Sequence, residues 1–237
     1  MENLFGLIHE DANLLVVNKP AGLVCHPTKN GEMSSLIGRA RLHLGENAKP
    51  HLVNRLDRET SGVVLIAKNP EIAGELGKAL ENRTVEKEYL AIVYGHILDD
   101  RGLIDAPLGK DERSTVAVKD CVRPDGATAQ TEYWVERRFS KNSSPFSLLR
   151  IVPRTGRKHQ IRIHLAHLGH PIVGDKIYGG DEDLYLALVE NRLTTEQRAR
   201  LIFENHALHA RSLRFTLKEQ SLEFSCEPEP WFTKFVT

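Results

Sequence analysis

The most restrictive feature of this chain is a continuous apolar run, VVLIAK at residues 63–68, that directly follows a charged segment, RLDRETSG at residues 55–62. An apolar run of this length without polar alternation predicts a buried strand. The segment before it has no clear period, so residues 51–62 are expected to form a loop. We therefore expect a loop with charged side chains that leads directly into a buried strand of the core.

The remaining pattern predicts an α+β fold. Strands and helices do not alternate strictly, which favours a mixed, largely antiparallel central sheet with flanking helices and loops. We expect one domain over residues 1–237, with two lobes around a catalytic cleft. Strands are expected at 14–20, 87–95, 131–135, 146–152 and 207–217, the last as a strand pair or one bent strand, and residues 99–128 as an exposed hairpin region. Helices are expected from Ser34 or Ser35 to Leu44, over 70–82, in the segment that ends at Gly169, and over 194–204 with a capping box from Thr194 to Gln197.

Composition and charge limit the class of protein. Three cysteines lie far apart without a CxxC, so no disulfide framework is expected and a reducing, cytoplasmic setting is favoured. No leader sequence is evident, and no apolar run approaches the ~20 residues of a membrane span. Lys and Arg number 32, as do Asp and Glu, which counts mildly against a nucleic-acid binder. The distribution is more informative, because residues 137–176 contain one acid, Asp175, and nine bases: Arg137, Arg138, Lys141, Arg150, Arg154, Arg157, Lys158, Arg162 and Lys176.

The loop RLDRETSG is a candidate catalytic segment. Asp57 is flanked by Arg55 and Arg58, and a neighbouring guanidinium favours the ionised form of a carboxyl group. Gly62 and the small residues Thr60 and Ser61 let another chain approach closely. An ionised carboxylate in such a loop can attack a sugar C1′ or act as a base. A purely structural Arg–Asp–Arg cluster is the alternative.

A second candidate segment is GRKHQIRIHLAHLGHPIVGDKIYG at residues 156–179. On a helix, His159 and Arg162 are three residues apart, so both can face one cleft while Ile161 and Leu165 pack behind them. Ile161, Leu165 and Leu168 are expected on one helical face. Arg162 is then available to a carboxylate from elsewhere in the chain. The nearby histidines invite a metal site, but no HExxH and no carboxylate at ligand spacing accompany them, so no metal is expected. His209 is left open between a structural and an RNA-facing role.

The chain resembles the RluA-type family of RNA pseudouridine synthases. The resemblance rests on VNKPAGLVCHP, NRLDRETSGVVLIAKN, KEYLAIVYG and GRKHQIRIHLAHLGHPIVGDKIYG, which keep the family's order and span most of the chain. It implies the pseudouridine synthase catalytic fold. Two positions depart from the family: Asn54 stands where His is common, and Lys158 where Thr is common. Both lie near the RNA path that the resemblance implies, so they bear on substrate choice. No room is expected for the N-terminal S4 domain that some relatives carry.

The resemblance also implies roles for individual residues. Asp57 would be the catalytic carboxylate, and Arg162 its ion-pair partner. Arg55 would help displace the target base and fill the space it leaves, and Tyr89 would lie against the uracil, although a tyrosine of a core strand is the plain alternative for that position. Further contacts with the substrate are expected from Arg58, Thr60, Gly156, Arg157, His159 and Gln160.

The expected activity is an isomerase that converts specific uridines of tRNA or rRNA to pseudouridine after flipping the nucleotide out of its stack. The reaction gains and loses no atoms, so no cofactor is expected, in keeping with the lack of a Rossmann fingerprint or P-loop. The expected partner is RNA, without a membrane or a metal, and a monomer is favoured. Two alternatives stay open: an N-glycoside hydrolase, for which Glu59 would pair with Asp57, and a catalytically silent RNA-binding protein. The choice between attack on C1′ and removal of the 2′ hydrogen also stays open.

Overall fold

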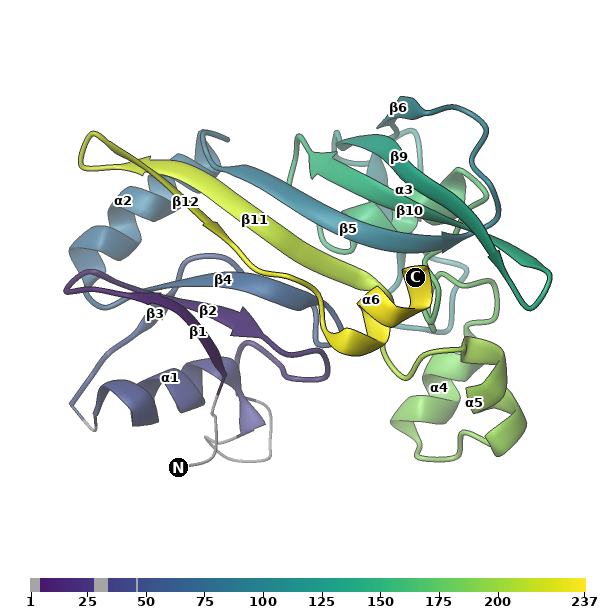
Figure 1. Cartoon of the computed structure of the whole chain (residues 1–237), viewed down its shortest axis with the longest axis horizontal. Coiled ribbons are helices and arrows are strands. Elements are labelled where there is room, and N and C mark those ends of the chain that lie inside the picture. Colours follow the sequence, from purple (N-terminus) through teal and green to yellow (C-terminus); the bar gives the residue numbers. More distant parts are fainter. Residues whose placement is uncertain (1–4, 28–33, 46) are drawn as a thin grey trace. The chain divides into compact units, whose positions relative to one another are not determined.

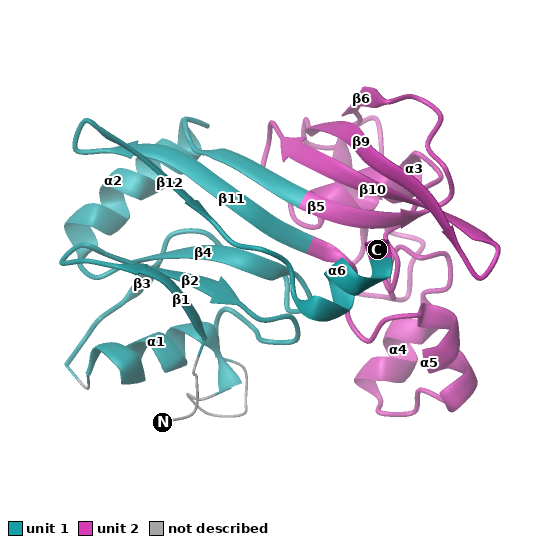
Figure 2. Ribbon diagram, viewed as in Figure 1, with its two compact units in different colours: residues 1–89, 209–235, 237 teal, residues 90–208, 236 magenta. Residues whose placement is uncertain are grey.

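The structure is a computed structural model that describes residues 5–27, 34–45 and 47–237 (Figure 1). Within this part of the chain, ten of the twelve strands belong to one mostly antiparallel sheet, which confirms the predicted α+β class. The chain divides into two compact units (Figure 2). Unit 1 holds residues 1–89, 209–235 and 237, and unit 2 holds residues 90–208 and 236. The chain enters unit 2 within β5 (Glu86–Tyr94) and returns to unit 1 within β11 (Leu208–Leu217).

Unit 1 is built on strands in the order β1-β2-β4-β11, with β3 paired to β4 and β12 paired to β11. The β4–β11 pairing is parallel, whereas the other pairings in this unit are antiparallel. The strand bounds are β1 Gly6–Glu10, β2 Leu14–Lys19, β3 His51–Leu52, β4 Ser61–Ala67 and β12 Gln220–Ser225.

Both faces of β2 and β4 are buried, which explains their unbroken apolar runs. Alternate side chains of a strand point to opposite faces, and here each face has its own helix. Val63 and Leu65 pack with Ile72 and Leu76 of α2 (Pro70–Glu81). Val64 and Ile66 pack with Leu36, Ile37 and Ala40 of α1 (Leu36–Leu44). The predicted buried strand is confirmed, as are the two helices that cover it. Of the two serines considered as caps for the first helix, Ser35 caps it, and Gly45 ends it.

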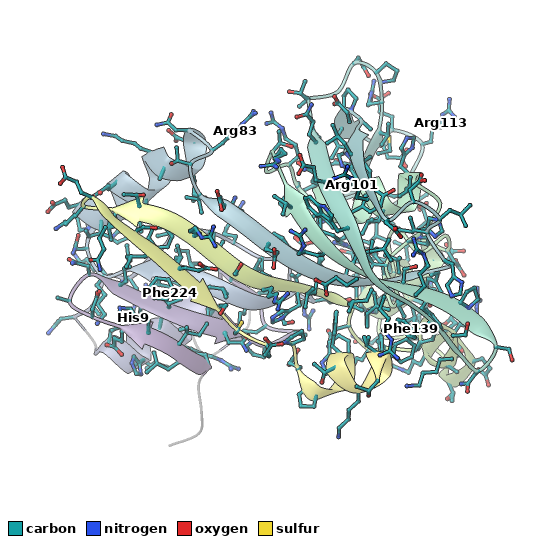
Figure 3. All side chains as sticks on the ribbon, turned by 45° about the horizontal axis from the view of Figure 1, so that its top comes forward. His9, Arg83, Arg101, Arg113, Phe139 and Phe224 are labelled. Carbon is teal, nitrogen blue, oxygen red and sulfur yellow. The ribbon has the colours of Figure 1, made fainter. Side chains whose placement is uncertain are left out.

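Three elements of unit 1 lack a strong sequence signal. Strand β12 alternates between exposed and half-buried residues, so it shows no apolar run, and β1 is short and mostly exposed. The two strands meet through their side chains, where the rings of His9 and Phe224 lie 5.1 Å apart (Figure 3). The C-terminal helix α6 (Pro230–Val236) follows them.

Unit 2 contains a long hairpin. Strands β9 (Gln130–Lys141) and β10 (Ser144–Pro153) pair antiparallel, and β6 (Arg101–Asp105) pairs with β9. Asn142 and Ser143 make the turn with positive φ angles of 50° and 63°, a geometry that suits the twist of a two-residue hairpin loop. The hairpin therefore extends well past the strand expected at 131–135. Strands β7 (Leu108–Lys110) and β8 (Asp120–Val122) form a separate two-stranded sheet in the predicted hairpin region.

Three helices complete unit 2: α3 (Gln160–His167), α4 (Asp183–Val189) and α5 (Thr195–Leu201). The capping box of α5 from Thr194 to Gln197 is present as predicted, whereas α4 was not predicted. Helix α3 is buried on all sides over residues 160–165, so the prediction of one apolar face that includes Leu168 is wrong. Ile161 and Leu165 are buried, but Leu168 follows the helix and is 38% exposed. No helix of the described residues is long and apolar enough to cross a membrane.

The parallel contact between β4 and β11 depends on one glycine. Ser61 and Gly62 lie in register with His209 and Ala210. Gly62 has a φ angle of 118°, and a Cβ atom added there would lie 2.2 Å from the carbonyl oxygen of Ala210. The expected close approach at Gly62 is made by β11 of the same chain.

We expect Gly62→Ala to destabilise the protein by at least about 2 kcal/mol, because the new methyl group meets backbone atoms and the residue is held at positive φ. Denaturant unfolding monitored by circular dichroism measures the change. Gly74→Ala in α2 is a matched control, since no atom lies within 4 Å of its added Cβ. Alanine in a helix interior should stabilise there by roughly 0.5–1 kcal/mol. Equal stability of Gly62→Ala and wild type would contradict the assigned contact.

Candidate active site

Asp57 lies in unit 1, in the loop between β3 and β4, and is partly buried. The loop ends in a tight turn, in which the backbone N–H of Thr60 donates to the carbonyl oxygen of Asp57 at 3.2 Å. Ser61 then begins β4. The carboxylate is therefore carried on a short turn that is attached directly to a core strand.

Two side chains fix the first half of this loop. Asn54 is buried, and its amide donates to the carbonyl of Val63 at 3.3 Å and accepts from the N–H of Leu65 at 2.7 Å. The Cys25 thiol pairs with both the N–H and the carbonyl of Leu56 at 3.4 Å. Asn54, which departs from the family pattern, thus holds the loop against β4, and we assign it a structural role.

A buried lysine fixes the second half. Lys19 has no exposed surface, and its ammonium group donates to the carbonyl oxygens of Pro20, Leu23 and Arg58 at 3.0, 2.8 and 3.1 Å. Burial lowers the pKa of Lys19 to about 8, although the nearby charges of Cys25, Glu229 and Asp57 act in the opposite direction. Lys19 therefore ties the backbone next to Asp57 to the end of β2 and places a cation within electrostatic reach of the carboxylate.

Tyr89 belongs to the same unit and lies near Asp57. Its ring packs against the apolar cluster that contains Leu56, Val64 and Ala210. Burial raises the pKa of the Tyr89 hydroxyl, and the negative charge of Asp57 raises it further. The hydroxyl consequently stays protonated at neutral pH, and Tyr89 lies within electrostatic reach of the Asp57 carboxylate.

The two arginines beside Asp57 are exposed. Arg58 donates from Nε to the carbonyl of Gly22 at 3.1 Å, while its own carbonyl accepts from the N–H of Gly22 at 2.9 Å. Arg58 is thereby held against the segment after β2, and Arg55 extends from the same loop. Thr60, by contrast, is buried, so we treat it as part of the turn.

Arg162 lies in unit 2, on α3, and is buried with a carboxylate that the sequence did not single out. Its Nε and Nη2 atoms donate to Asp175 at 2.7 and 2.9 Å. Burial alone would raise the pKa of the Asp175 carboxyl, but the charge and hydrogen bonds of Arg162 outweigh burial and hold it well below its usual range. Asp175 also accepts the N–H groups of Ile177 and Tyr178. The Asp175 carboxylate thus stabilises the turn of the GDKIYG loop and also binds two nitrogen donors of Arg162.

Tyr178 borders Arg162 on another side. The guanidinium carbon lies 5.0 Å from the centre of the Tyr178 ring. The Tyr178 hydroxyl accepts from the N–H of Asp120 at 3.3 Å and lies 2.9 Å from Nδ1 of His159, to which it can donate. His159 has a left-handed φ of 55° at the start of α3. The structure therefore brings His159 and Arg162 together through Tyr178.

The other predicted contacts of unit 2 differ in exposure. Gly156 and Arg157 are exposed, and Arg157 donates from Nε to the carbonyl of Thr128 at 3.1 Å. Gln160 is 4% exposed, and its amide bonds to Thr155, Arg157, Gln130 and Thr131. We therefore treat Gln160 as structural. Lys158, the second departure from the family pattern, forms an ion pair with Asp120 at 2.8 Å.

The clustered histidines do not converge. His164 is fully buried, and its ring nitrogens bond to Thr131 at 2.8 Å and to the carbonyl of Ala106 at 2.9 Å. His170 bonds to the carbonyl of Tyr94 at 2.8 Å. Across the described ranges, no group of three or more His, Cys, Asp or Glu side chains is placed to hold a metal ion.

Sequence reasoning missed the residues that hold the candidate catalytic groups. Lys19 and Cys25 lie in the motif VNKPAGLVCHP, and Asp175 and Tyr178 lie in the motif GDKIYG. The motifs were therefore recognised, but the contacts that these four residues make were not predicted. A lysine that ends an otherwise apolar strand was the clearest clue. Asp57, Arg55 and Tyr89 belong to unit 1, and Arg162 and His159 to unit 2, so the pairing of Asp57 with Arg162 stays a prediction.

Curated relatives resemble most of this chain. An RNA pseudouridine synthase of Aquifex aeolicus is 38% identical over 185 residues, which cover 75% of this chain and 57% of the relative. Ribosomal large subunit pseudouridine synthase D of Pseudomonas aeruginosa is 35% identical over 212 residues, which cover 87% of this chain and 62% of that relative. The chain thus spans about six tenths of the length of these relatives.

Solved structures and a family model agree with these relatives. The human protein RNA Pseudouridylate Synthase Domain Containing 4 matches with a TM-score of 0.74 at 29% identity, covering 96% of this chain and 90% of that one. Human RNA Pseudouridylate Synthase Domain Containing 1 matches with a TM-score of 0.75 at 26% identity, covering 95% of this chain and 84% of that one. The family model for RNA pseudouridylate synthase matches residues 13–167, which include Asp57, Tyr89 and Arg162. The chain therefore belongs to the RNA pseudouridylate synthase family, as the resemblance to its RluA-type members predicted.

Proposed function

We propose that the protein is an RNA pseudouridine synthase that uses Asp57 as its catalytic carboxylate. The observation that carries this proposal is the placement of Asp57: a partly exposed carboxylate, on a turn fixed to a core strand, within electrostatic reach of Tyr89. Membership of the family supports the reaction class. A protein that only bound RNA would need no carboxylate held in this way, because a carboxylate repels phosphate.

The proposed reaction breaks the N1–C1′ bond, turns the uracil and joins C5 to C1′. The departing uracil carries a delocalised negative charge, so a strong general acid is not required. Asp57 acts at the ribose, either by attack on C1′ or by removal of the 2′ hydrogen. Both routes need an ionised carboxylate, and the positive charge of Lys19 favours that form.

The target nucleotide must leave its stack before Asp57 reaches the sugar, which costs a few kcal/mol. Stacking of the extruded base on the Tyr89 ring would offset about 1–3 kcal/mol of this cost. Arg55 is exposed on the same loop, so it is available to fill the vacated position in the RNA. These two side chains, together with Arg58, are the substrate contacts that we propose in unit 1.

We propose that Arg162 supports Asp57 with a guanidinium edge other than the one that Asp175 binds. Asp175 engages Nε and Nη2. A guanidinium has five N–H donors in a fixed fork, so one carboxylate does not exhaust it. His159, Gly156 and Arg157 are the proposed substrate contacts of unit 2.

Among RNA classes, large-subunit ribosomal RNA is the first substrate to test, because several relatives are named ribosomal large subunit pseudouridine synthase D. RNA labelled with tritium at C5 of uridine separates the possible activities. An isomerase releases tritium into water, an N-glycoside hydrolase releases free uracil, and a silent binder releases neither. Binding of labelled ribosomal RNA and tRNA without release of tritium from either would contradict the proposal.

Asp57→Asn should abolish tritium release while RNA affinity changes little, because the substitution removes the reacting charge without removing a phosphate contact. Single-turnover tritium release and filter binding measure the two quantities. Glu59→Gln is the matched control, since it alters the neighbouring carboxylate and should retain activity. Substantial tritium release by Asp57→Asn would defeat the assignment.

Arg162→Met should lower the single-turnover rate sharply and also destabilise the fold by about 3–5 kcal/mol, because it leaves the Asp175 charge buried and uncompensated. The double variant Arg162→Met/Asp175→Asn separates these effects, since no uncompensated buried charge remains in that pair. We expect it to recover much of the stability in thermal unfolding but not the rate. Recovery of the rate together with stability would show that Arg162 acts only on the fold.

A further inference from the structure

We propose that His209 is a positioning residue for Asp57, linking the end of the catalytic loop to the C-terminal segment of the chain. This inference rests on the proposed function, because it assigns His209 a role in the reaction of Asp57. Burial excludes the RNA-facing role that the sequence left open, since His209 has no exposed surface.

His209 bridges two backbone segments of unit 1. Its Nδ1 atom lies 2.9 Å from the hydroxyl of Ser61, and its Nε2 atom lies 3.0 Å from the carbonyl oxygen of Cys226. Ser61 is the first residue of β4 and directly follows the turn that carries Asp57. Cys226 directly follows β12. The imidazole therefore connects the catalytic turn with the chain's last segment.

The partners fix the protonation of the ring. A carbonyl oxygen can only accept, so Nε2 carries the proton that is donated to Cys226. In a neutral imidazole Nδ1 then accepts, and the Ser61 hydroxyl donates to it. Burial lowers the pKa of His209, which keeps the ring in this neutral form near pH 7. Both hydrogen bonds consequently have a defined direction, and together they orient the Ser61 side chain.

The C-terminal segment is itself tied to the other side of the catalytic loop. The N–H of Cys226 donates to the carbonyl of Arg211 at 3.0 Å. Three residues later, the Glu229 carboxylate accepts from the N–H of Ala21 at 3.4 Å and from the Trp231 indole at 3.2 Å. Ala21 lies between Lys19 and Gly22, which both bond to Arg58 of the loop. His209 and the segment from Cys226 to Trp231 lie beyond the residues that the family model matches.

This arrangement matters for chemistry because an error of about 1 Å in a catalytic group can cost on the order of 100-fold in rate. Gly62 brings the backbones of β4 and β11 together, and Lys19 holds the backbone of Arg58. The Ser61–His209–Cys226 bridge adds the contact that orients the Ser61 side chain at the end of the turn. Its loss should therefore appear in the rate of the chemical step more than in RNA binding.

Two near-isosteric substitutions test the bridge. The amide of Asn reaches the position of Nδ1 in His209→Asn, so that variant can keep the Ser61 link and loses the Cys226 link. The longer His209→Gln reaches the position of Nε2 and does the reverse. Ser61→Ala removes the first link with a smaller change. His96→Gln is the matched control, because His96 is exposed and bonds only to the carbonyl of Phe139 among the contacts in the structure.

We expect His209→Asn, His209→Gln and Ser61→Ala each to lower the single-turnover rate of tritium release by roughly 10- to 100-fold. The dissociation constant for RNA should change less than about threefold, and His96→Gln should match wild type. Ser61→Ala combined with His209→Gln should be no slower than either single variant, since both break the same link.

Wild-type rates in variants that fold normally would overturn the inference. The inference would also be overturned if the loss of rate in each variant were explained by its fraction of unfolded protein, measured by circular dichroism. That result would show that His209 acts on the fold alone. Failure of the proposed function looks different, since wild-type protein would then release no tritium from any RNA tested.

Discussion

The candidate active site depends on hydrogen bonds that buried side chains make at one short loop, residues 54–61. Lys19 and Cys25 bond to main-chain atoms of this loop, Asn54 reaches from the loop to the backbone of β4, and His209 bonds to the Ser61 side chain at the end of the loop. Backbone groups are obligatory partners whose positions follow from the fold, so contacts to them transmit the rigidity of the sheet to the loop. A carboxylate on an exposed, unsupported loop would lack this preorganisation, which is the main contribution a protein can make to a reaction without a cofactor.

Arg162 in unit 2 is held by a different device. A bidentate pair with a fully buried carboxylate contributes little net stability, because desolvation of both charges opposes their attraction. It does fix the orientation of the guanidinium plane, and the Tyr178 ring limits it further. Both units therefore use buried polar groups to set the direction of a functional side chain. In both, those polar groups come from motifs that the family resemblance includes but whose roles periodicity and spacing do not reveal.

The sequence predicted the elements that have a strong periodic or apolar signal, such as β4, α1 and α2, whereas the catalytic roles of the residues in its long motifs stay predictions. It failed where tertiary context decides. Helix α3 has no solvent-exposed face over residues 160–165, where its polar side chains are buried too, whereas Leu168 at its end is exposed, so the argument from amphipathicity failed here. Strand β12 is short and at most half-buried, and its position follows from pairing with β11 rather than from local pattern. Asp175 was noticed only as an acid in a basic stretch, since nothing local shows that it binds Arg162.

Several bases of that stretch form ion pairs with acids of the protein itself. Between residues 137 and 176, Arg138 pairs with Asp100, Arg154 with Glu132, and Lys158 with Asp120, all acids from outside the stretch. Ion pairing inside the protein competes with phosphate neutralisation, so a count of bases along the sequence overstates the charge offered to RNA. For the proposed RNA substrate, the zero net charge and these pairs reduce the number of bases that can contact phosphate. In the proposed reaction the position of the Asp57 loop bears on selectivity as well as on rate, because only a nucleotide that reaches this carboxylate can react.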